Sequence, residues 1–333
     1  MLDINEAYAR CAALSAAHLG RTAPNPNVSA VIYSADGTFI AEGAHDRRTS
    51  PDHAEVVAIK KAGEQARGAT IVVSLEPCNH TGSTGPCVDA IIDAGIARVI
   101  YAVKDPNPIA AGGAERLKTA GVVVELVESA QLADVQGAWL HRIRTGRPYF
   151  IWKVATTLDG RIAAVDGTSQ WISSEASRAD VQILRNQSDA ILIGTGTALA
   201  DNPTLAPRVE KANSPIRIVM GTRDIPADAN LNISDGQTVY LKTRSVDELL
   251  KAIDYLPLNQ VLVEAGPQLG SALFAAGVID EVVTYQAPKV LGSGRTWMEE
   301  IGVATINDAT TLTLLSVEQI DSDVKFRYRV EKR

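Results

Sequence analysis

The sequence predicts an α/β protein built from two domains. Its 333 residues exceed the usual size of a single hydrophobic core. The composition, 46% hydrophobic and 21% charged, is that of an ordinary globular protein. From about residue 52 to 127 helical and strand patterns alternate, which favours an α/β sandwich with a partly parallel sheet. We expect the boundary at the basic turn 144–150, with domains of residues 1–147 and 148–333.

The first domain opens with an Ala-rich segment, 3–19, whose apolar residues follow helical spacing and which ends at Gly20. "VSAVIY" and "TFIAEG" flank Asp36-Gly37 and predict a hairpin. Ser50-Pro51-Asp52 predicts a helix start, with Asp52 as the cap of a helix running to about residue 66. The remaining expected elements are a strand at 69–75, a helix at 85–95, a strand at 97–103, a helix at 112–121, a strand at 122–127 and a helix at 130–144.

The second domain also mixes strand and helix patterns. Its first expected strand spans 148–163, and a helix follows at 174–187. We then expect strands at 189–194, 215–220, 237–241, 260–266, 281–291 and 323–330, and helices at 246–255 and 267–276.

Bulk charge and the N-terminus restrict the function classes. The formal charge of −7 and the pI of about 5.3 oppose binding to nucleic acid or to an anionic membrane surface. The start of the chain does not have the pattern of a signal peptide, and no apolar run approaches the ~20 residues that span a bilayer. Three cysteines, an odd number, are a poor disulfide framework. We therefore expect a cytoplasmic protein with reduced thiols and no membrane or nucleic-acid partner.

Metal-binding residue types are concentrated in the first domain, because all five histidines and all three cysteines precede residue 148. His53 lies at a helix start, Cys78 at a strand end and Cys87 at the next helix start, so the three can converge. One His and two Cys supply three ligands of a tetrahedral zinc and leave one position open. Glu55 then lies where it can carry a proton, as in zinc deaminases. Cys11 is interpreted as a packing residue.

Two other interpretations of this cluster stay open. His80 could contact the substrate, which we favour, or it could be a fourth ligand that closes a purely structural site. The chain could also be a nucleic-acid deaminase with an appended ligand-binding domain, although charge disfavours this, and one of the two halves could be inactive.

The second domain lacks the usual dinucleotide fingerprint, since Leu199 stands where G-x-G-x-x-G requires its third glycine. Two strand-to-helix turns remain, at 191–199 and 261–273. In the second, Gly266-Pro267 precedes a helix whose free N–H groups could bind phosphate. Gly270 would let a pyrophosphate or a neighbouring element come close.

Several stretches together resemble one enzyme family. "TAPNPNVSAVI", "HAEVVAI", "EPCNHTGSTGPC" and "VKDPNP" are similar to the deaminase half of the bifunctional riboflavin-biosynthesis deaminase/reductases. "KVATTLDGRIA", "SQWIS", "VLVEAGPQLGSAL" and "APKVLG" are similar to the reductase half. The resemblance covers nearly the whole chain. It implies a cytidine-deaminase-like α/β/α sandwich followed by a dihydrofolate-reductase-like α/β domain, with Zn2+ and NADPH as cofactors.

The resemblance also implies roles for individual residues. In the first domain His53, Cys78 and Cys87 hold zinc, Glu55 carries the proton and Asn25 contacts the pyrimidine. In the second the implied cofactor-binding residues are Ala155, Trp171, Thr197, Asp201, Gly266, Pro267, Gln268, Leu269 and Gly270. The implied substrate-binding residues are Ser169, Arg185, Leu205, Arg208 and Glu264. From the residues themselves we add Lys153 as a pocket residue and Arg223 as the contact of the NADPH 2′-phosphate.

Some positions depart from the family pattern. Ser29 stands where glycine is usual in the family. Ser83 stands where a basic residue is usual, which puts phosphate binding by the 76–87 loop in doubt. Ala265 and Asn202 are milder changes. The activity implied is zinc-dependent deamination of a diaminopyrimidinone ribosyl phosphate, followed by NADPH reduction of the ribosyl group to a ribityl chain. We also expect a homo-oligomer.

Overall fold

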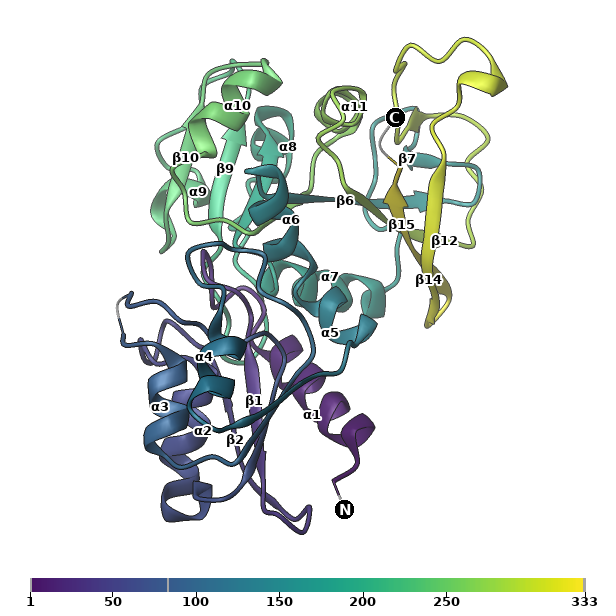
Figure 1. Ribbon diagram of the computed structural model, residues 1–333. Coiled ribbons are helices and arrows are strands. Elements are labelled where there is room, and N and C mark those ends of the chain that lie inside the picture. Colours follow the sequence, from purple (N-terminus) through teal and green to yellow (C-terminus); the bar gives the residue numbers. More distant parts are fainter. Residues whose placement is uncertain (1, 83, 332–333) are drawn as a thin grey trace. The chain divides into compact units, whose positions relative to one another are not determined.

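The protein, described by a computed structural model covering residues 2–82 and 84–331, consists of two compact units, Met1–Gly146 and Arg147–Arg333 (Figure 1). Ser83, one of the family departures, lies outside the described residues. Each unit has an α/β architecture, which confirms the predicted fold class. No helix in the described part of the chain is both long and apolar enough to cross a membrane.

The first unit is built on a five-stranded sheet of order β2-β1-β3-β4-β5. Its strands are β1 (Ser29–Tyr33), β2 (Phe39–Ala44), β3 (Thr70–Val73), β4 (Arg98–Tyr101) and β5 (Val123–Leu126). β1 pairs antiparallel with β2 and β3, whereas β3, β4 and β5 are parallel. The helices are α1 (Ile4–Ala17), α2 (Ala54–Ala62), α3 (Cys87–Asp93), α4 (Gly113–Thr119), α5 (Ala130–Val135) and α6 (Gly137–Thr145), with a 3-10 turn at Gly63–Ala66.

Both faces of this sheet are buried, as β1 illustrates. Ala30 and Ile32 pack into one core with α2 and α3, while Val31 and Tyr33 pack into another with α1 and Cys11. Successive side chains of a strand point to opposite faces, so a strand buried on both sides is continuously apolar. The result is an α/β/α sandwich, with α1 on one side of the sheet and α2 and α3 on the other (Figure 1).

The second unit contains an eight-stranded sheet of order β10-β9-β8-β11-β6-β12-β15-β14. Its strands are β6 (Tyr149–Thr157), β8 (Ala190–Gly194), β9 (Ile216–Met220), β10 (Thr238–Leu241), β11 (Gln260–Val263), β12 (Glu281–Ala287), β14 (Leu312–Ile320) and β15 (Asp323–Val330). The pairs from β10 to β12 are parallel, and β15 and β14 add antiparallel. β7 (Arg161–Ala163) and β13 (Arg295–Thr296) form a separate two-stranded sheet.

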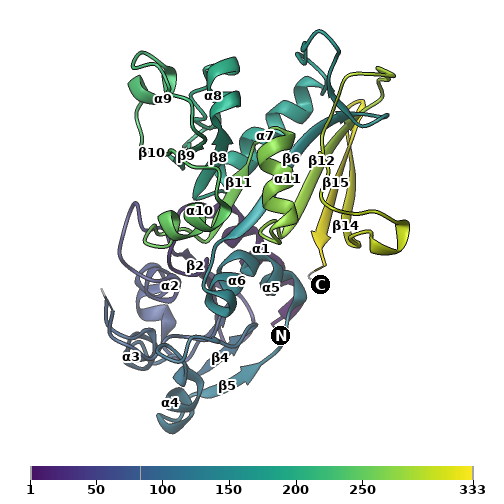
Figure 2. The same cartoon turned by 90° about the horizontal axis from the view of Figure 1, so that it is seen from above.

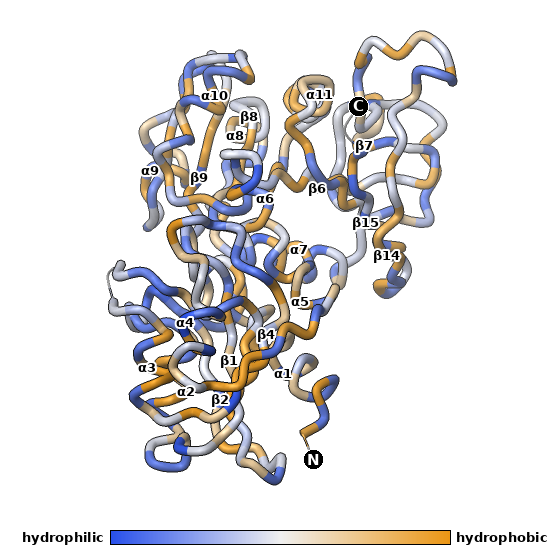
Figure 3. Tube along the Cα trace, viewed as in Figure 1, coloured by the Kyte–Doolittle hydropathy of each residue, from blue (hydrophilic) through white to orange (hydrophobic). Residues whose placement is uncertain are grey.

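Helices cover both faces of the large sheet. The unit contains α7 (Glu175–Asn186), α8 (Thr195–Asp201), α9 (Asn230–Ile233), α10 (Val246–Ile253) and α11 (Pro267–Ala275), with a 3-10 turn at Ile306–Asp308. α10 and α11 share a core with Trp152, and α7 and α8 share a second core on the other face (Figure 2). Strands such as β4 and β9 are largely hydrophobic along their length (Figure 3).

The structure corrects several element predictions. Asp52 does not cap α2: its carboxylate accepts a hydrogen bond from Lys60 at 2.6 Å, and His53 is the N-cap residue. The expected helix 130–144 is two helices, α5 and α6, and the expected strand 148–163 is broken by a turn at 158–160. The expected strand at 281–291 ends at Ala287.

Two strands were not predicted, the two-residue β13 and the longer β14 (Leu312–Ile320). β14 is the one that belongs to the large sheet. It lies at the sheet edge and is exposed on both faces along most of its length, so it lacks the inside-outside alternation that identifies a strand in a sequence.

Candidate functional site

The first unit brings His53, Cys78 and Cys87 together from three elements. His53 precedes α2, Cys78 lies in the loop after β3, and Cys87 is the first residue of α3. Their ligand atoms lie within 4.8 Å of one another. His53 Nδ1 is 3.5 Å from Cys78 Sγ and 3.3 Å from Cys87 Sγ.

These separations fit zinc. Tetrahedral coordination with ordinary Zn–S and Zn–N bond lengths holds a sulfur and a nitrogen ligand about 3.5 Å apart. The backbone N–H of Cys87 donates to Cys78 Sγ at 3.4 Å, which favours the thiolate that a metal needs. The hydrogen bond between the two thiols lowers the pKa of Cys78 and raises the pKa of Cys87, so the pair shares a proton that a bound cation displaces.

Glu55 lies beside this cluster in the first turn of α2 and is buried. Burial, together with the negative charge on Cys78, raises the pKa of Glu55 to about 7. A carboxyl group with a pKa near neutrality can both accept and donate a proton at the operating pH. The same helix start therefore supplies a metal ligand and a group suited to proton transfer.

His80 is not part of the three-ligand group found among the described residues. Its Nδ1 atom is buried and has no hydrogen-bond partner among the residues that the structure describes. The interpretation of His80 as a fourth ligand therefore has no support in this geometry. An unpaired buried nitrogen costs free energy, which fits a side chain that awaits a polar partner.

Asn25 is held by a residue that sequence reasoning missed, His45. His45 Nδ1 lies 2.9 Å from the Asp52 carbonyl oxygen and must donate to it, so Nε2 accepts from Asn25 Nδ2 at 3.1 Å. Burial lowers the pKa of His45, consistent with this neutral tautomer. The His45 ring also lies 5.2 Å from the His53 ring, edge to face. His45 thereby fixes the orientation of the Asn25 amide beside the metal ligands.

The second unit brings four predicted residues together at the carboxyl ends of its parallel strands. Arg185 of α7 donates to both carboxylate oxygens of Glu264, at 2.5 and 2.8 Å. Lys153 of β6 is close enough to interact electrostatically with Glu264 and with Asp201, the last residue of α8. Burial lowers the pKa of Lys153, although the Glu264 carboxylate opposes that effect. Ligands of parallel α/β sheets bind at this edge.

Other predicted residues lie around this edge without joining the ion-pair cluster. Ser169 and Trp171 lie in the exposed segment between β7 and α7, where Arg178 stacks 4.4 Å from the Trp171 ring. Ala155 is on β6 and Thr197 on α8, both half-buried. Leu205 is buried in the segment after α8, and Arg208 is exposed there.

The turn at 266–270 shows two different uses of glycine. Gly266 caps α11, Pro267 follows at its first position, and open space surrounds the Gly266 Cα. Gln268 is exposed and Leu269 half-buried in the first turn of this helix. A Cβ on Gly270, however, would lie 2.0 Å from the Trp152 ring. Of the two alternatives for Gly270, the element that comes close in this structure is Trp152.

Arg223 lines a cavity of about 400 Å³ beside the carboxyl ends of β9 and β10, together with Thr195, Gly221, Tyr240 and Lys242. The cavity carries two cationic side chains, of which Lys242 is paired with Asp224 at 2.5 Å. A cationic cavity at this sheet edge and the open start of α11 fit the phosphate groups of a dinucleotide.

Comparisons with known proteins cover both units. Residues 3–103 match the family model described as the cytidine and deoxycytidylate deaminase zinc-binding region, and residues 148–326 match the RibD C-terminal domain. The chain is 44% identical to the riboflavin biosynthesis protein RibD of Mycobacterium tuberculosis, over 92% of this chain and 91% of that protein. It is 38% identical to the Escherichia coli RibD, over 96% of this chain and 98% of that protein.

Solved structures agree with these matches. RibD of Acinetobacter baumannii superposes with a TM-score of 0.89 at 35% identity, covering 98% of each chain. A diaminohydroxyphosphoribosylaminopyrimidine deaminase/5-amino-6-(5-phosphoribosylamino)uracil reductase from Thermotoga maritima superposes with a TM-score of 0.88 at 30% identity, again over 98% of each chain.

Proposed function

The chain belongs to the RibD family of bifunctional riboflavin-biosynthesis enzymes, and on this premise we propose which of its residues perform each reaction. The protein is a zinc-dependent deaminase and an NADPH-dependent reductase. The substrate of the first reaction is a diaminopyrimidinone ribosyl 5′-phosphate. That of the second is the deaminated aminouracil, whose ribosyl group is reduced to a ribityl chain.

The first unit carries the deaminase. The observation that supports this most is the convergence of His53, Cys78 and Cys87 beside the buried Glu55. Zinc held by these three ligands would supply Lewis-acid activation of the attacking water. Glu55 accepts a proton from that water and delivers it to the departing amine, which leaves as ammonia. Asn25, oriented by His45, holds the pyrimidine, and His80 Nδ1 offers a further polar contact.

The second unit carries the reductase. NADPH would supply the hydride to C1′ of the ribosyl group. Glu264, fixed by its two hydrogen bonds from Arg185, is an oriented acceptor for sugar hydroxyls. The Arg185 guanidinium is already paired with Glu264, so we assign binding of the substrate's 5′-phosphate to the exposed Arg208. Lys153 of β6 interacts electrostatically with the same carboxylate, and we assign it a role in holding Glu264 in position.

The remaining predicted residues form the rest of this reductase site. Ser169 and Leu205 complete the substrate side. Ala155, Trp171, Thr197, Asp201 and the 266–270 turn face NADPH, and Arg223 binds its 2′-phosphate in the cavity beside β10.

Glu55→Gln tests the deaminase assignment. Gln has nearly the same shape but cannot transfer a proton, so ammonia release should fall by about 10²- to 10⁴-fold. Metal analysis should still find zinc, because the three ligands are untouched. The second unit offers an internal control: NADPH oxidation with the deaminated substrate should be unchanged. Full ammonia release by this variant would show that the zinc site is structural.

The working form of the protein is part of the proposal. We place it in the cytoplasm, where the free thiols Cys78 and Cys87 stay reduced and able to bind metal. We also propose a homo-oligomer, because β14 is an edge strand that exposes Leu314, Leu315 and Val317. Light scattering of the purified protein measures its mass, and a monomer at micromolar concentration would contradict this.

A further inference from the structure

A second polar cavity lies in the first unit, and none of the three proposed metal ligands is among its lining residues. Its volume is about 300 Å³, and it is lined by Asn25, His45, Arg47, Arg48, Thr49, Ser50 and Pro51. Asn25 and His45 already belong to the deaminase site. Arg47 and Arg48 have no part in the reaction as proposed so far, and both side chains are exposed.

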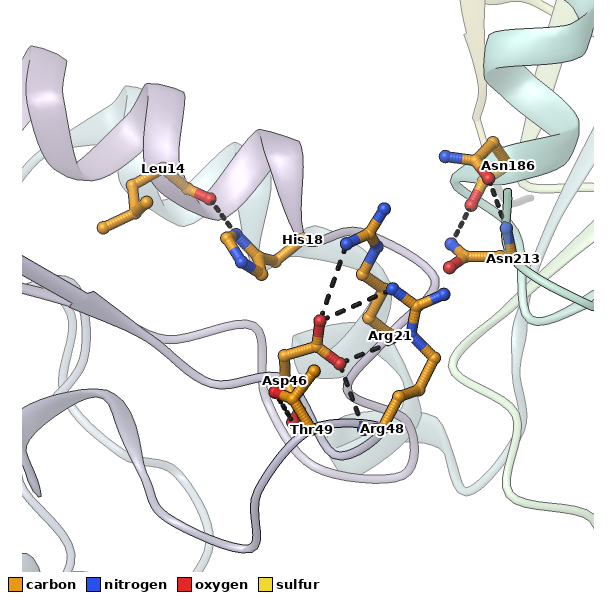
Figure 4. A network of polar contacts seen from close by, with 8 residues as sticks. All are labelled: Leu14, His18, Arg21, Asp46, Arg48, Thr49, Asn186 and Asn213. Carbon is orange, nitrogen blue, oxygen red and sulfur yellow. Dashed lines mark hydrogen bonds and ion pairs between the residues drawn. The ribbon is translucent and has the colours of Figure 1, made fainter. Parts of the chain in front are cut away.

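The turn that carries these two arginines is tightly built around Asp46. The Asp46 carbonyl oxygen accepts from the backbone N–H groups of Thr49 and Ser50, both at 3.1 Å. Its carboxylate accepts from the Arg48 backbone N–H at 3.0 Å. The same carboxylate pairs with the side chains of Arg48, at 3.4 Å, and Arg21, at 3.5 Å (Figure 4). The turn thus presents its cationic side chains from a fixed backbone.

Arg47 is anchored separately. Its backbone N–H donates to the Arg21 carbonyl oxygen at 3.2 Å, and its Nη1 donates to the Ala23 carbonyl oxygen at 2.8 Å. Ala23 is two residues before Asn25, so Arg47 is tied to the segment that carries the predicted pyrimidine contact. Arg21, Arg47 and Arg48 outnumber Asp46, so this turn carries a net positive charge. A guanidinium held in place loses less conformational entropy when it binds an anion.

The cavity adjoins the metal ligands through His45, whose ring lies 5.2 Å from that of His53. A pyrimidine held by Asn25, with its amine-bearing carbon toward the ligands, can therefore extend its ribosyl phosphate into the cavity. The loop that follows β3 offers no alternative cation, because residues 76–87 contain neither Lys nor Arg.

We propose that Arg47 and Arg48 bind the 5′-phosphate of the deaminase substrate. This rests on the proposed deaminase function of the first unit. Guanidinium groups match the geometry of phosphate oxygens, and charge-assisted hydrogen bonds are the stronger kind. The two arginines touch neither the reacting carbon nor the metal ligands, so they act on substrate affinity and leave the chemical step alone.

The test compares Arg47→Gln, Arg48→Gln and the double variant with wild type. With the phosphorylated substrate, each single change should raise KM for ammonia release by about 10-fold or more, and kcat should stay within about 2-fold. With the dephosphorylated nucleoside, wild type and variants should have the same KM. Arg48→Lys should recover part of the affinity, because the charge remains.

Arg98→Gln is a matched control. The side chains of Arg98 and Arg48 are both 40% exposed, and Arg98 is likewise paired with a carboxylate, Glu125, at 2.8 Å. This variant should leave KM unchanged. Zinc content and melting temperature of every variant exclude a folding defect as the cause of a KM change.

A binding measurement separates this proposal from the deaminase function itself. The full chain is titrated with ribose 5-phosphate in a calorimeter. The number of binding sites should be larger by one for wild type than for the double variant. Failure of wild type to release ammonia overturns the deaminase assignment. In that case the titration still shows whether Arg47 and Arg48 bind a sugar phosphate. An unchanged KM for the phosphorylated substrate, or identical titrations, would refute the role of Arg47 and Arg48.

Discussion

Ser29, at the start of β1, fills a position where the family resemblance implies glycine, and the structure shows what its hydroxyl does. The hydroxyl donates to the Cys11 carbonyl oxygen at 2.8 Å and accepts from Ser15 Oγ at 2.8 Å. Ser29 and Ser15 are both fully buried. The hydroxyl is therefore satisfied by two residues of α1, and it ties that helix to β1. The departure strengthens packing and does not touch the metal site.

Replacing Ser29 tests this tie. Ser29→Ala should lower the free energy of unfolding of the first unit by about 1–2 kcal/mol, because it leaves buried polar groups without their partner. Ser29→Gly should cost about 0.5–1 kcal/mol more through backbone entropy. Urea denaturation followed by circular dichroism measures both, and zinc content should not change. Equal stability of Ser29→Ala and wild type would mean that the hydroxyl contributes nothing.

Arg223 tests coenzyme selectivity at the same scale. Its guanidinium lies beside the start of α8, where a Cβ on Gly196 would approach Nη2 to 2.9 Å. Only NADPH carries the 2′-phosphate that this cation is proposed to bind. Arg223→Ala should therefore raise KM for NADPH by about 10-fold or more and leave KM for NADH nearly unchanged. Equal changes in both values would rule out this assignment.

At the scale of elements, the start of α7 is fixed to β15. Asp323, the first residue of β15 and almost fully buried, accepts from the Ser174 backbone N–H and from Ser177 Oγ, both at 2.7 Å. Ser174 is itself the N-cap residue of α7. Because α7 carries Arg185 at its far end, this contact helps to position the Arg185–Glu264 pair.

The contact predicts a pH-dependent stability. Burial alone would raise the pKa of Asp323, but the hydrogen bonds from Ser177 and Ser174 outweigh it and lower the pKa. A lowered native pKa means that the stabilisation is complete above the unfolded value, about 3.9, and is lost as pH falls through the native value.

Asp323→Asn should therefore cost about 1–3 kcal/mol at pH 7 and progressively less on acidification below pH ~4. Thermal unfolding of wild type and variant from pH 7 to pH 3 measures the difference. A difference that is constant with pH would show that the carboxylate charge has no part in it.

At the scale of the whole molecule, each unit has its own hydrophobic cores. The core clusters of the first unit contain only residues up to 140, and those of the second only residues from 149 onward. The proposed ligands His53, Cys78 and Cys87 come from the start of α2, the loop after β3 and the start of α3, so bound zinc is expected to stabilise the first unit. Among the described residues of the second unit no group of this kind is found, so its stability is not expected to depend on the metal.

Metal removal should therefore separate the two units. A chelator should lower the melting temperature of the first unit by roughly 10 °C, as expected when a ligand present at ~10³ times its Kd is withdrawn. The transition of the second unit, and NADPH oxidation with the deaminated substrate, should be unaffected. Differential scanning calorimetry resolves the transitions, and a single transition that shifts as a whole would contradict independent units.

The sequence alone determined the fold class, the family, the activity and the order of most elements. The fold class and the order of the elements depend on local patterns, such as apolar periodicity and Gly and Pro at element ends. The spacing of His53, Cys78 and Cys87 indicates a zinc deaminase, whereas the family, the substrate and the NADPH-dependent reduction depend on the resemblance of whole stretches of sequence. Local patterns failed at Asp52, where pairing with Lys60 replaced the expected cap, and at β14, whose faces are both exposed.

Only the tertiary structure decided which distant residues meet. It placed Trp152 over Gly270, engaged Arg185 with Glu264, and fixed Arg47 to Ala23 beside the metal site. These contacts join segments that are 24 to 118 residues apart, and their geometry depends on how helices and strands pack. Packing depends on the whole core, so the periodicity of a single segment cannot predict which distant residues come into contact.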